Sequence, residues 1–192
     1  GLMSVVFTPV GVRDILHLPL NELTNRYVSL EEALGREGKD MEEQMMNLAG
    51  FNERVDSLET FLLGRLQRRN EFENNRMRMV MTRLLQCRGM FNVEQLAGYA
   101  CLSKKQFERV FSTYVGLMPK QYLRVIRFLY AVEFRNRMPE VDLATLAFHT
   151  GYYDAAHLAK EIKALTGHTS STLFQLMCFS EDADSIEWFL GV

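Results

Sequence analysis

Basic and amide side chains follow one another at the start of a helical segment in the second half of the chain. The residues of this segment that could contact a ligand are Ser103, Lys104, Lys105, Gln106 and, one helical turn later, Arg109. Arg, Lys and Gln read purine edges in the major groove of B-DNA through paired hydrogen bonds. Because the N-terminal turn of a helix in the major groove reaches the bases, this segment predicts a DNA-reading helix.

A second segment, 51 residues further along the chain, offers weaker chemistry of the same kind. Its outward residues are Asp154, Ala155, Ala156, His157, Lys160 and Lys163. The Lys and His side chains can contact phosphates, and the alanine methyl groups can contact the methyl group of thymine. We therefore expect the first segment to supply most of the charge-driven affinity and the second to add to it.

The charge of the chain is unevenly distributed, which its net charge of -2 conceals. Residues 1–75 hold 8 Lys and Arg against 13 Asp and Glu, residues 76–177 hold 14 against 7, and residues 178–192 hold none against 4. A basic block between two acidic ones is expected where one domain contacts phosphates. A solvated basic face without a partner would give the same count.

An internal repeat places both segments on the same kind of element. Leu96-Ala97 matches Leu146-Ala147 at an offset of 50 residues, and Gly116 matches Gly167 at an offset of 51. Each copy predicts a helix, a short turn and a second helix. The expected helix N-caps are Asn92, Ser103, Asp142 and Asp154.

Apolar periodicity gives each second helix a buried face and predicts a long helix between the copies. The inward residues are Phe107, Val110, Phe111 and Tyr114 in the first copy, and Leu158, Ile162 and Leu165 in the second. The segment Pro119–Arg137 has Pro at a favourable first helical position, and it would span about 28 Å at about 1.5 Å per residue. Successive major-groove faces lie about 34 Å apart. The pattern therefore predicts an all-α fold with two helix-turn-helix subdomains joined by a linker helix.

The first 75 residues predict a small, mostly helical region with one strand at Val5–Gly11. A single strand cannot form a sheet, so either it packs on helices or the chain begins inside a larger protein. Ser29 opens a capping-box pattern, and Asp40 is expected to cap a helix over 41–48. Apolar residues recur at helical spacing from residue 52 to about residue 69, which predicts a helix that could join two copies of the chain. The polar residues 67–76 fit either a linker or an exposed helix.

Residues 76–177 resemble the DNA-binding domain of the AraC/XylS family. The motifs that carry the resemblance are Leu96-Ala97, Ser103, Arg109-Val110-Phe111, Gly116-Leu117-Met118-Pro119, Tyr122 through Arg127, and Gly151 through Leu158. The resemblance implies two helix-turn-helix motifs that bind adjacent major grooves of a promoter. The residues that we expect to contact DNA are Ser103, Lys104, Lys105, Gln106, Arg109, Lys120, Arg124, Arg127, Asp154, Ala155, Ala156, His157, Lys160 and Lys163.

The sequence departs from the family pattern after the second copy. Thr169-Ser170 stands where the family usually has Thr-Pro, and Leu173-Phe174-Gln175 lacks an Arg that is often found there. One phosphate contact is therefore expected to be weaker. Residues 1–75 resemble, less specifically, the helical end of a regulatory and dimerisation domain. Family members often sense a small molecule in an upstream β-barrel, most of which could not fit before Gly11.

Other classes of function lack their sequence signals. The cysteines, Cys87, Cys101 and Cys178, are odd in number and far apart, which argues against a disulfide framework and fits a reducing compartment. Cys101 is expected to be a small buried residue of its turn, with a redox switch as the alternative. No apolar run approaches the roughly 18 residues of a membrane span, and no signal peptide pattern occurs, so a cytoplasmic location is expected. Metal-ligand spacing, phosphate loops and catalytic constellations are also missing, and we expect no cofactor and no enzyme activity.

Two functions remain. The first is a sequence-specific transcription regulator with a helical regulatory or dimerisation region at 1–75, a DNA-binding domain at 76–177 and an acidic tail at 178–192. Its expected partners are double-stranded DNA, RNA polymerase, a second copy of the chain through the helix near 52–69, and an effector of unidentified chemistry, but no membrane. The alternative is a helical protein-interaction or effector-sensing module that binds DNA weakly or not at all. The acidic tail could pack on the domain or compete with DNA for its basic face.

Overall fold

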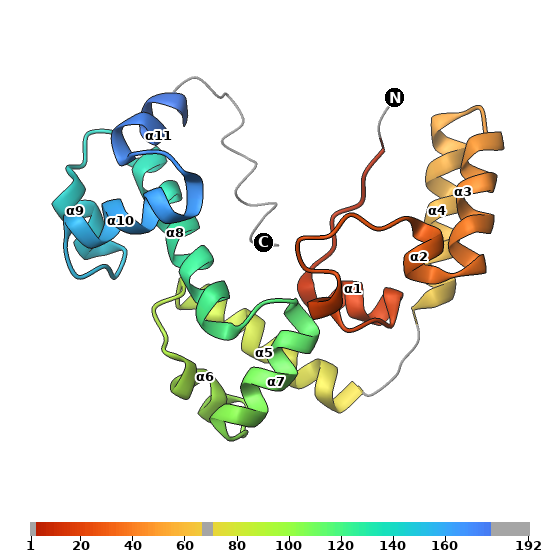
Figure 1. The fold of residues 1–192 in the computed structure, drawn as a ribbon, viewed down its shortest axis with the longest axis horizontal. Coiled ribbons are helices and arrows are strands. Elements are labelled where there is room, and N and C mark those ends of the chain that lie inside the picture. Colours follow the sequence, from red (N-terminus) through yellow and green to blue (C-terminus); the bar gives the residue numbers. More distant parts are fainter. Residues whose placement is uncertain (1–2, 67–70, 178–192) are drawn as a thin grey trace. The chain divides into compact units, whose positions relative to one another are not determined.

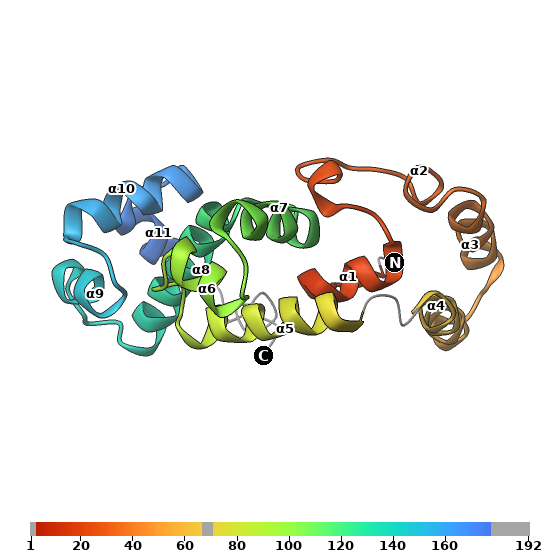
Figure 2. The same ribbon diagram turned by 90° about the horizontal axis from the view of Figure 1, so that it is seen from below.

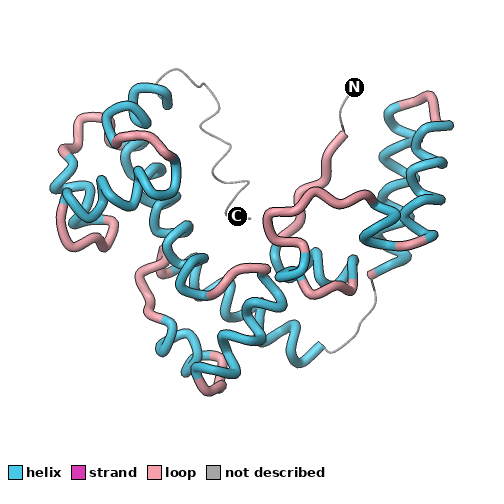
Figure 3. The backbone as a smooth tube through the Cα atoms, in the orientation of Figure 1, coloured by secondary structure: helices cyan, strands magenta, loops and turns pink. Residues whose placement is uncertain are grey.

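The computed structural model describes residues 3–66 and 71–177, and the regular elements in that part of the chain are all helices (Figures 1 and 3). The all-α prediction is therefore confirmed. The chain divides into two compact units, Gly1–Met79 with Lys105–Met118, and Val80–Lys104 with Pro119–Val192. The predicted helix end near residue 69 and the acidic tail at 178–192 lie outside the described residues. The functional division at residues 75 and 177 stays a prediction.

The first helix lies where the sequence predicted a strand. Residues 3–8 have no regular structure, and α1 (Pro9–Leu16) follows them. The Thr8 side chain accepts a hydrogen bond from Gly11 N at 3.1 Å, and Pro9 occupies the first helical position. The strand prediction for Val5–Gly11 was wrong because Thr-Pro starts a helix here. No partner strand occurs among the described residues.

The helices that follow in the first unit are α2 (Leu30–Leu34), α3 (Arg36–Asn47) and α4 (Phe51–Arg65), after a 3₁₀ turn at Leu20–Glu22. The Ser29 side chain accepts a hydrogen bond from Glu32 N at 3.0 Å and caps α2, as predicted. The prediction of an Asp40 cap was wrong, since α3 has already begun at that point. Gly38 lies where α3 passes close to the start of α2. A Cβ on Gly38 would lie 2.0 Å from Leu30 O, so only glycine allows α3 to approach α2 this closely.

Arg65, the last residue of α4, connects this helix to α1 and α3. Its Nε donates to Ile15 O at 2.9 Å, and its guanidinium pairs with Glu37. The His17 ring lies with Nε2 3.1 Å from Arg65 O. The predicted helix from residue 52 is thus confirmed as far as Arg65. The first part of α5 (Glu71–Gln86) and most of α7 (Lys104–Val115) complete the first unit, so the predicted polar stretch is helical from Glu71 onward.

The second unit contains the end of α5 with α6 (Val93–Tyr99), α8 (Pro119–Arg137), α9 (Leu143–His149), α10 (Ala155–Thr166) and α11 (Ser170–Met177). The helix predicted over Pro119–Arg137 is confirmed at both ends. In Figure 2, α8, α9 and α10 lie against one another and α11 lies against α10, in agreement with their contacts. Their shared core consists of Ala131, Leu146, Ala147, Tyr152, Leu158 and Ile162.

Local sequence sets the helix starts in the second unit. Asn92 Oδ1 accepts from Gln95 N at 2.8 Å, and Gln95 Oε1 accepts in return from Asn92 N at 2.9 Å. Asp142 caps α9 and Asp154 caps α10. These three cap predictions are confirmed.

The described residues contain no helix with the length and apolarity of a membrane span.

The turn between α6 and α7 differs from the expectation. Cys101 is exposed, so its predicted burial was wrong. Its φ of 54° lies in the left-handed region, where Gly151 occupies the corresponding position of the second copy with a φ of 74°. The turn geometry is therefore shared by both copies, although only one of them uses glycine.

Candidate nucleic-acid interface

Helix α7 has the two faces that the sequence predicted. Phe107, Phe111 and Tyr114 are at most 2% exposed, and the rings of Phe107 and Phe111 lie 5.4 Å apart. The exposed residues at its start are Lys104, Lys105, Gln106 and Arg109, with Ser103 exposed directly before the helix. Since the opposite side is fully buried, the basic side is the one that α7 offers to a partner.

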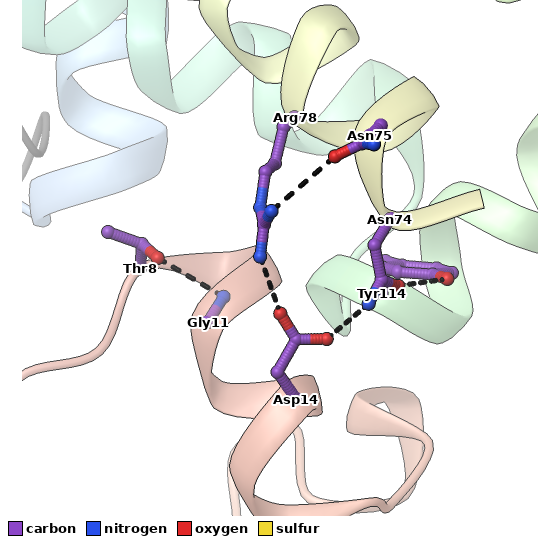
Figure 4. A network of polar contacts seen from close by, with 7 residues as sticks. All are labelled: Thr8, Gly11, Asp14, Asn74, Asn75, Arg78 and Tyr114. Carbon is purple, nitrogen blue, oxygen red and sulfur yellow. Dashed lines mark hydrogen bonds and ion pairs between the residues drawn. The ribbon is translucent and has the colours of Figure 1, made fainter. Parts of the chain in front are cut away.

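The last turn of α7 is held by residues of α1, of α5 and of the turn that contains Thr24, and the contact with α5 is drawn in Figure 4. Tyr114 Oη donates to Asn74 Oδ1 of α5 at 2.8 Å, and the Arg13 guanidinium of α1 lies 4.3 Å from the centre of the Tyr114 ring. Thr24 Oγ1 donates to Gly116 O at 2.6 Å just beyond the helix. Burial, and secondly the nearby Glu73 carboxylate, raise the pKa of Tyr114 to about 12. The phenol therefore stays neutral and able to donate.

Asp14 of α1 is the buried centre of this polar network. Its side chain accepts hydrogen bonds from Asn74 Nδ2 and from Arg78 Nη2, the latter at 2.9 Å. Only 7% of the Asp14 side chain is exposed, whereas 58% of the Arg78 side chain is. A buried carboxylate requires such donors because an unpaired charge in the interior is costly. No sequence pattern predicted this role for Asp14.

Lys104 is engaged within the second unit. Its Nζ lies 2.6 Å from Glu94 Oε1 of α6, and this hydrogen bond is the main reason why the pKa of Glu94 lies below its ordinary value. More than half of each side chain is exposed. Exposed ion pairs are weak, so Lys104 can exchange Glu94 for a phosphate oxygen.

Helix α10 also has a buried and an exposed face, with less basic chemistry than α7. Leu158 and Ile162 are at most 1% exposed. The exposed residues are Ala156, His157, Lys160 and Lys163, and Ala155 is half-buried. This arrangement agrees with the outward residues predicted for the second copy.

Two predicted contact residues at the start of α10, Asp154 and His157, make contacts within the protein. Asp154 Oδ1 accepts from His157 N at 2.7 Å and therefore caps the helix. The His157 ring packs edge-on against Tyr152 with their centres 5.4 Å apart. Ala156 and Lys160 are thus left as the more accessible groups of the first turns.

The predicted residues of α8 have unequal surroundings. Lys120 is exposed on the first turn. Arg124 makes two hydrogen bonds to Glu161 of α10, and Arg127 makes two to Gly89 O. All three line one open cleft of about 800 Å³ in the second unit, together with residues of α6 and α10. Lys120 is therefore available to a phosphate, whereas the two arginines are already bonded.

Two further residues near the site escaped the sequence analysis. Glu161 is the partner of Arg124, 37 residues away, and no local pattern signals such a pair. Tyr153 is 92% exposed directly before the α10 cap, where an aromatic ring can stack or contact a sugar. Its position in the turn between Gly151 and the helix cap Asp154 was the sequence signal that could have predicted its exposure. No group of His, Cys, Asp and Glu within the described ranges could hold a metal ion.

Comparison with known proteins identifies the segment that carries this geometry. Residues 96–175 match the family model described as "Helix-turn-helix domain". A protein of Haemophilus influenzae, described as an "uncharacterized HTH-type transcriptional regulator", is 30% identical over 73 residues, which cover 38% of this chain and 24% of that protein. The match thus spans about a quarter of the length of that relative. No solved structure gave a significant match. Residues 96–175 are therefore similar to a helix-turn-helix domain of the AraC type, and this similarity agrees with the resemblance that the sequence motifs indicated.

Proposed function

We propose that the chain is a sequence-specific DNA-binding transcription regulator whose helices α7 and α10 enter adjacent major grooves of a promoter. The observation that carries the proposal is that both helices bury one apolar side and expose Lys, Arg or His on the other. The matched domain type and the description of the Haemophilus protein also support it. A helix of this size fits the major groove of B-DNA.

The two helices contribute differently in this proposal. Lys105, Gln106 and Arg109 of α7 supply base and phosphate contacts, because Arg and Gln pair with purine edges. Lys160 and Lys163 of α10 contact phosphates, and Ala156 contacts a thymine methyl group. Lys120 at the start of α8 adds a phosphate contact. Ser103 and Lys104 complete the first set.

The test is fluorescence anisotropy of the full chain with a random-sequence duplex of about 25 base pairs, a length that covers two turns of DNA, at several salt concentrations. The variant Lys105→Glu with Arg109→Glu should bind at least about 100-fold more weakly, because two favourable contacts become repulsive. Each lost phosphate contact should also reduce the slope of log affinity against log salt by about 0.9.

The matched control is Arg36→Glu with Lys39→Glu on α3, which makes the same change in net charge outside the helix-turn-helix segments. Its affinity should stay within about threefold of the wild type, since distant exposed charges are screened. An equal loss in both variants would reduce the effect to one of net charge and contradict the proposal.

The interaction-module alternative also has support in the structure. Glu94 pairs with Lys104 and Glu161 pairs with Arg124, so two of the basic side chains proposed for DNA contact are already bonded within the protein. The absence of binding to any duplex at low salt would favour the alternative over DNA binding.

The proposal includes a homodimer formed through α4. This helix exposes large apolar side chains, with Phe51 66%, Leu63 61% and Leu66, directly after it, 52% exposed. Leu63→Glu should then halve the molecular mass that sedimentation equilibrium measures, from that of a dimer to that of a monomer. An unchanged mass would show that α4 does not form the dimer interface.

The proposed contacts with RNA polymerase and with an effector rest on the family resemblance. A cytoplasmic location belongs to the same proposal, because a regulator acts where its promoter lies.

A further inference from the structure

We infer that Arg124 and Arg127 of α8 are positioning residues, which hold the second recognition helix and the loop before α6 on one linker helix rather than binding DNA themselves. The inference rests on the proposed function, which it deepens. It concerns residues of the second unit alone.

The Arg124 contact with α10 is bidentate. Its Nε donates to Glu161 Oε2 at 2.7 Å and its Nη2 donates to Glu161 Oε1 at 3.1 Å. Two parallel hydrogen bonds between planar groups fix orientation as well as distance. Glu161 lies on α10 with 19% of its side chain exposed, so the pair is partly shielded from water. The hydrogen bond to Glu161 also raises the pKa of Arg124 above its ordinary value.

The Arg127 contact fastens the loop before α6 to the same helix. Its Nε and Nη2 donate to Gly89 O at 3.3 and 2.8 Å. Gly89 has a φ of 70°, and a Cβ there would lie 2.7 Å from Leu123 O and 2.9 Å from Arg127 N. Only glycine allows the loop backbone to approach α8 in this way.

The two arginines are neighbours on the surface of α8, because residues three apart lie side by side on a helix. The Arg127 guanidinium also lies 5.7 Å from the centre of the Tyr152 ring, and Tyr152 contacts His157 at the start of α10. Both contacts of α8 therefore bear on the orientation of α10. A phosphate that approached Arg124 would meet a guanidinium whose charge is already paired with Glu161 and would have only its remaining N–H groups as donors.

Substitutions that change the net charge in opposite directions distinguish a positioning role of Arg124 from a direct DNA contact. The substitutions Arg124→Gln and Glu161→Gln change the net charge in opposite directions but break the same pair. A direct phosphate contact by Arg124 predicts opposite effects on affinity, because Glu161→Gln removes a negative charge near DNA. A positioning role predicts that both substitutions weaken specific binding alike.

The probe is a duplex that the wild-type chain selects from a random-sequence library, measured by anisotropy beside the random duplex. Each single variant should lose about tenfold in affinity for the selected duplex, the size typical of a coupled pair. Affinity for the random duplex should fall less. The double variant Arg124→Glu with Glu161→Arg should recover most of the specific affinity. Arg137→Gln is the matched control, since its ion pair with Glu133 at 2.6 Å stays within α8.

A readout without DNA keeps this inference separate from the proposed function. Amide hydrogen exchange in α10 should speed up in both single variants, return toward wild type in the double variant and stay unchanged in Arg137→Gln. If exchange in α10 is unaffected by both single variants, the positioning role is overturned. It is also overturned if Glu161→Gln binds DNA more tightly while Arg124→Gln weakens both duplexes and reduces the salt slope. Failure of the wild type to bind any duplex would refute the proposed function alone.

Discussion

Helices α7 and α10, the two proposed recognition helices, belong to equivalent helix-turn-helix copies but are held by different contacts. Helix α7 belongs to the unit that contains the start of the chain, and Arg13 and Asn74 contact its last turn through Tyr114. Helix α10 is held within the other unit, by the core around Leu158 and by Glu161. A perturbation of α1 can therefore reach α7 directly, whereas α10 depends on the linker helix.

The largest effects should come from the buried faces of the two helices. Phe111→Ala and Leu158→Ala each remove a side chain that is 0% exposed, and they should lower the free energy of unfolding by about 3–5 and 2–5 kcal/mol. Urea unfolding measures both values. Hydrogen exchange should accelerate in α1 and α7 for Phe111→Ala, and in α9 and α10 for Leu158→Ala. Identical exchange patterns would contradict the contrast.

Asp14→Asn tests whether the polar network centred on Asp14 of α1 stabilises the contact with α7. The amide removes the charge that Arg78 and Asn74 bond to and leaves donors facing one another, so the free energy of unfolding should fall by about 1–3 kcal/mol. Thermal unfolding with the exposed control Asp40→Asn, which should change stability by less than about 0.5 kcal/mol, provides the comparison. Equal stabilities would show that the Asp14 network contributes nothing.

The corresponding turns of the two copies should respond in opposite directions. Gly151→Ala places a side chain at a positive φ, which costs about 1–2 kcal/mol. Cys101→Gly relieves the same conformation and should stabilise the chain by less than about 1 kcal/mol, because glycine gains entropy in the unfolded state. The denaturant midpoints of the two variants, compared with the wild type, measure these changes in stability. A loss of stability in both variants would contradict the shared geometry.

Two buried tyrosines differ in their hydroxyl groups. Tyr114 Oη has a partner in Asn74, while Tyr152 Oη is buried without a hydrogen-bond partner among the described residues. Tyr114→Phe should therefore cost about 1 kcal/mol, whereas Tyr152→Phe should be neutral or slightly stabilising. Guanidinium titrations at pH 7 measure this difference, which would vanish if Tyr152 had an equivalent partner.

The pH dependence of these tyrosines follows from their raised pKa values. Burial is the main cause that raises the pKa of Tyr114 and of Tyr152 to about 12 in the folded chain, against 10 in the unfolded one. The folded state favours the neutral phenol, so this stabilisation is complete below pH 10 and disappears as the pH rises through 12. Each Phe variant should lose less stability over that interval than the wild type does.

The sequence predicted the elements whose causes are local. Asn92, Asp142 and Asp154 cap their helices through neighbours two or three residues away, and Pro119 starts a helix by its own ring. The strand at Val5–Gly11 was wrong because its β-branched residues outweighed the Thr-Pro start. The Asp40 cap was wrong because α3 begins four residues earlier, at Arg36, and its close approach to α2 at Gly38 depends on that second helix.

The site was predictable in its exposed residues and unpredictable in its long-range pairs. Lys105 and Arg109 are exposed on α7 as the periodicity indicated. The pairing of Arg124 with Glu161 and of Asp14 with Asn74 joins residues 37 and 60 positions apart. No spacing rule connects such residues, since the fold alone brings them together. A basic residue in a motif can therefore be bonded internally.

The most direct test of the two-groove claim is methylation interference with the full chain on its selected duplex. Methylation at guanine N7 blocks contacts in the major groove. Two interference clusters centred about 10–10.5 base pairs apart are predicted, since α7 and α10 would occupy successive grooves. Lys105→Glu with Arg109→Glu should remove one cluster. A single cluster in the wild type, or none, would contradict the account.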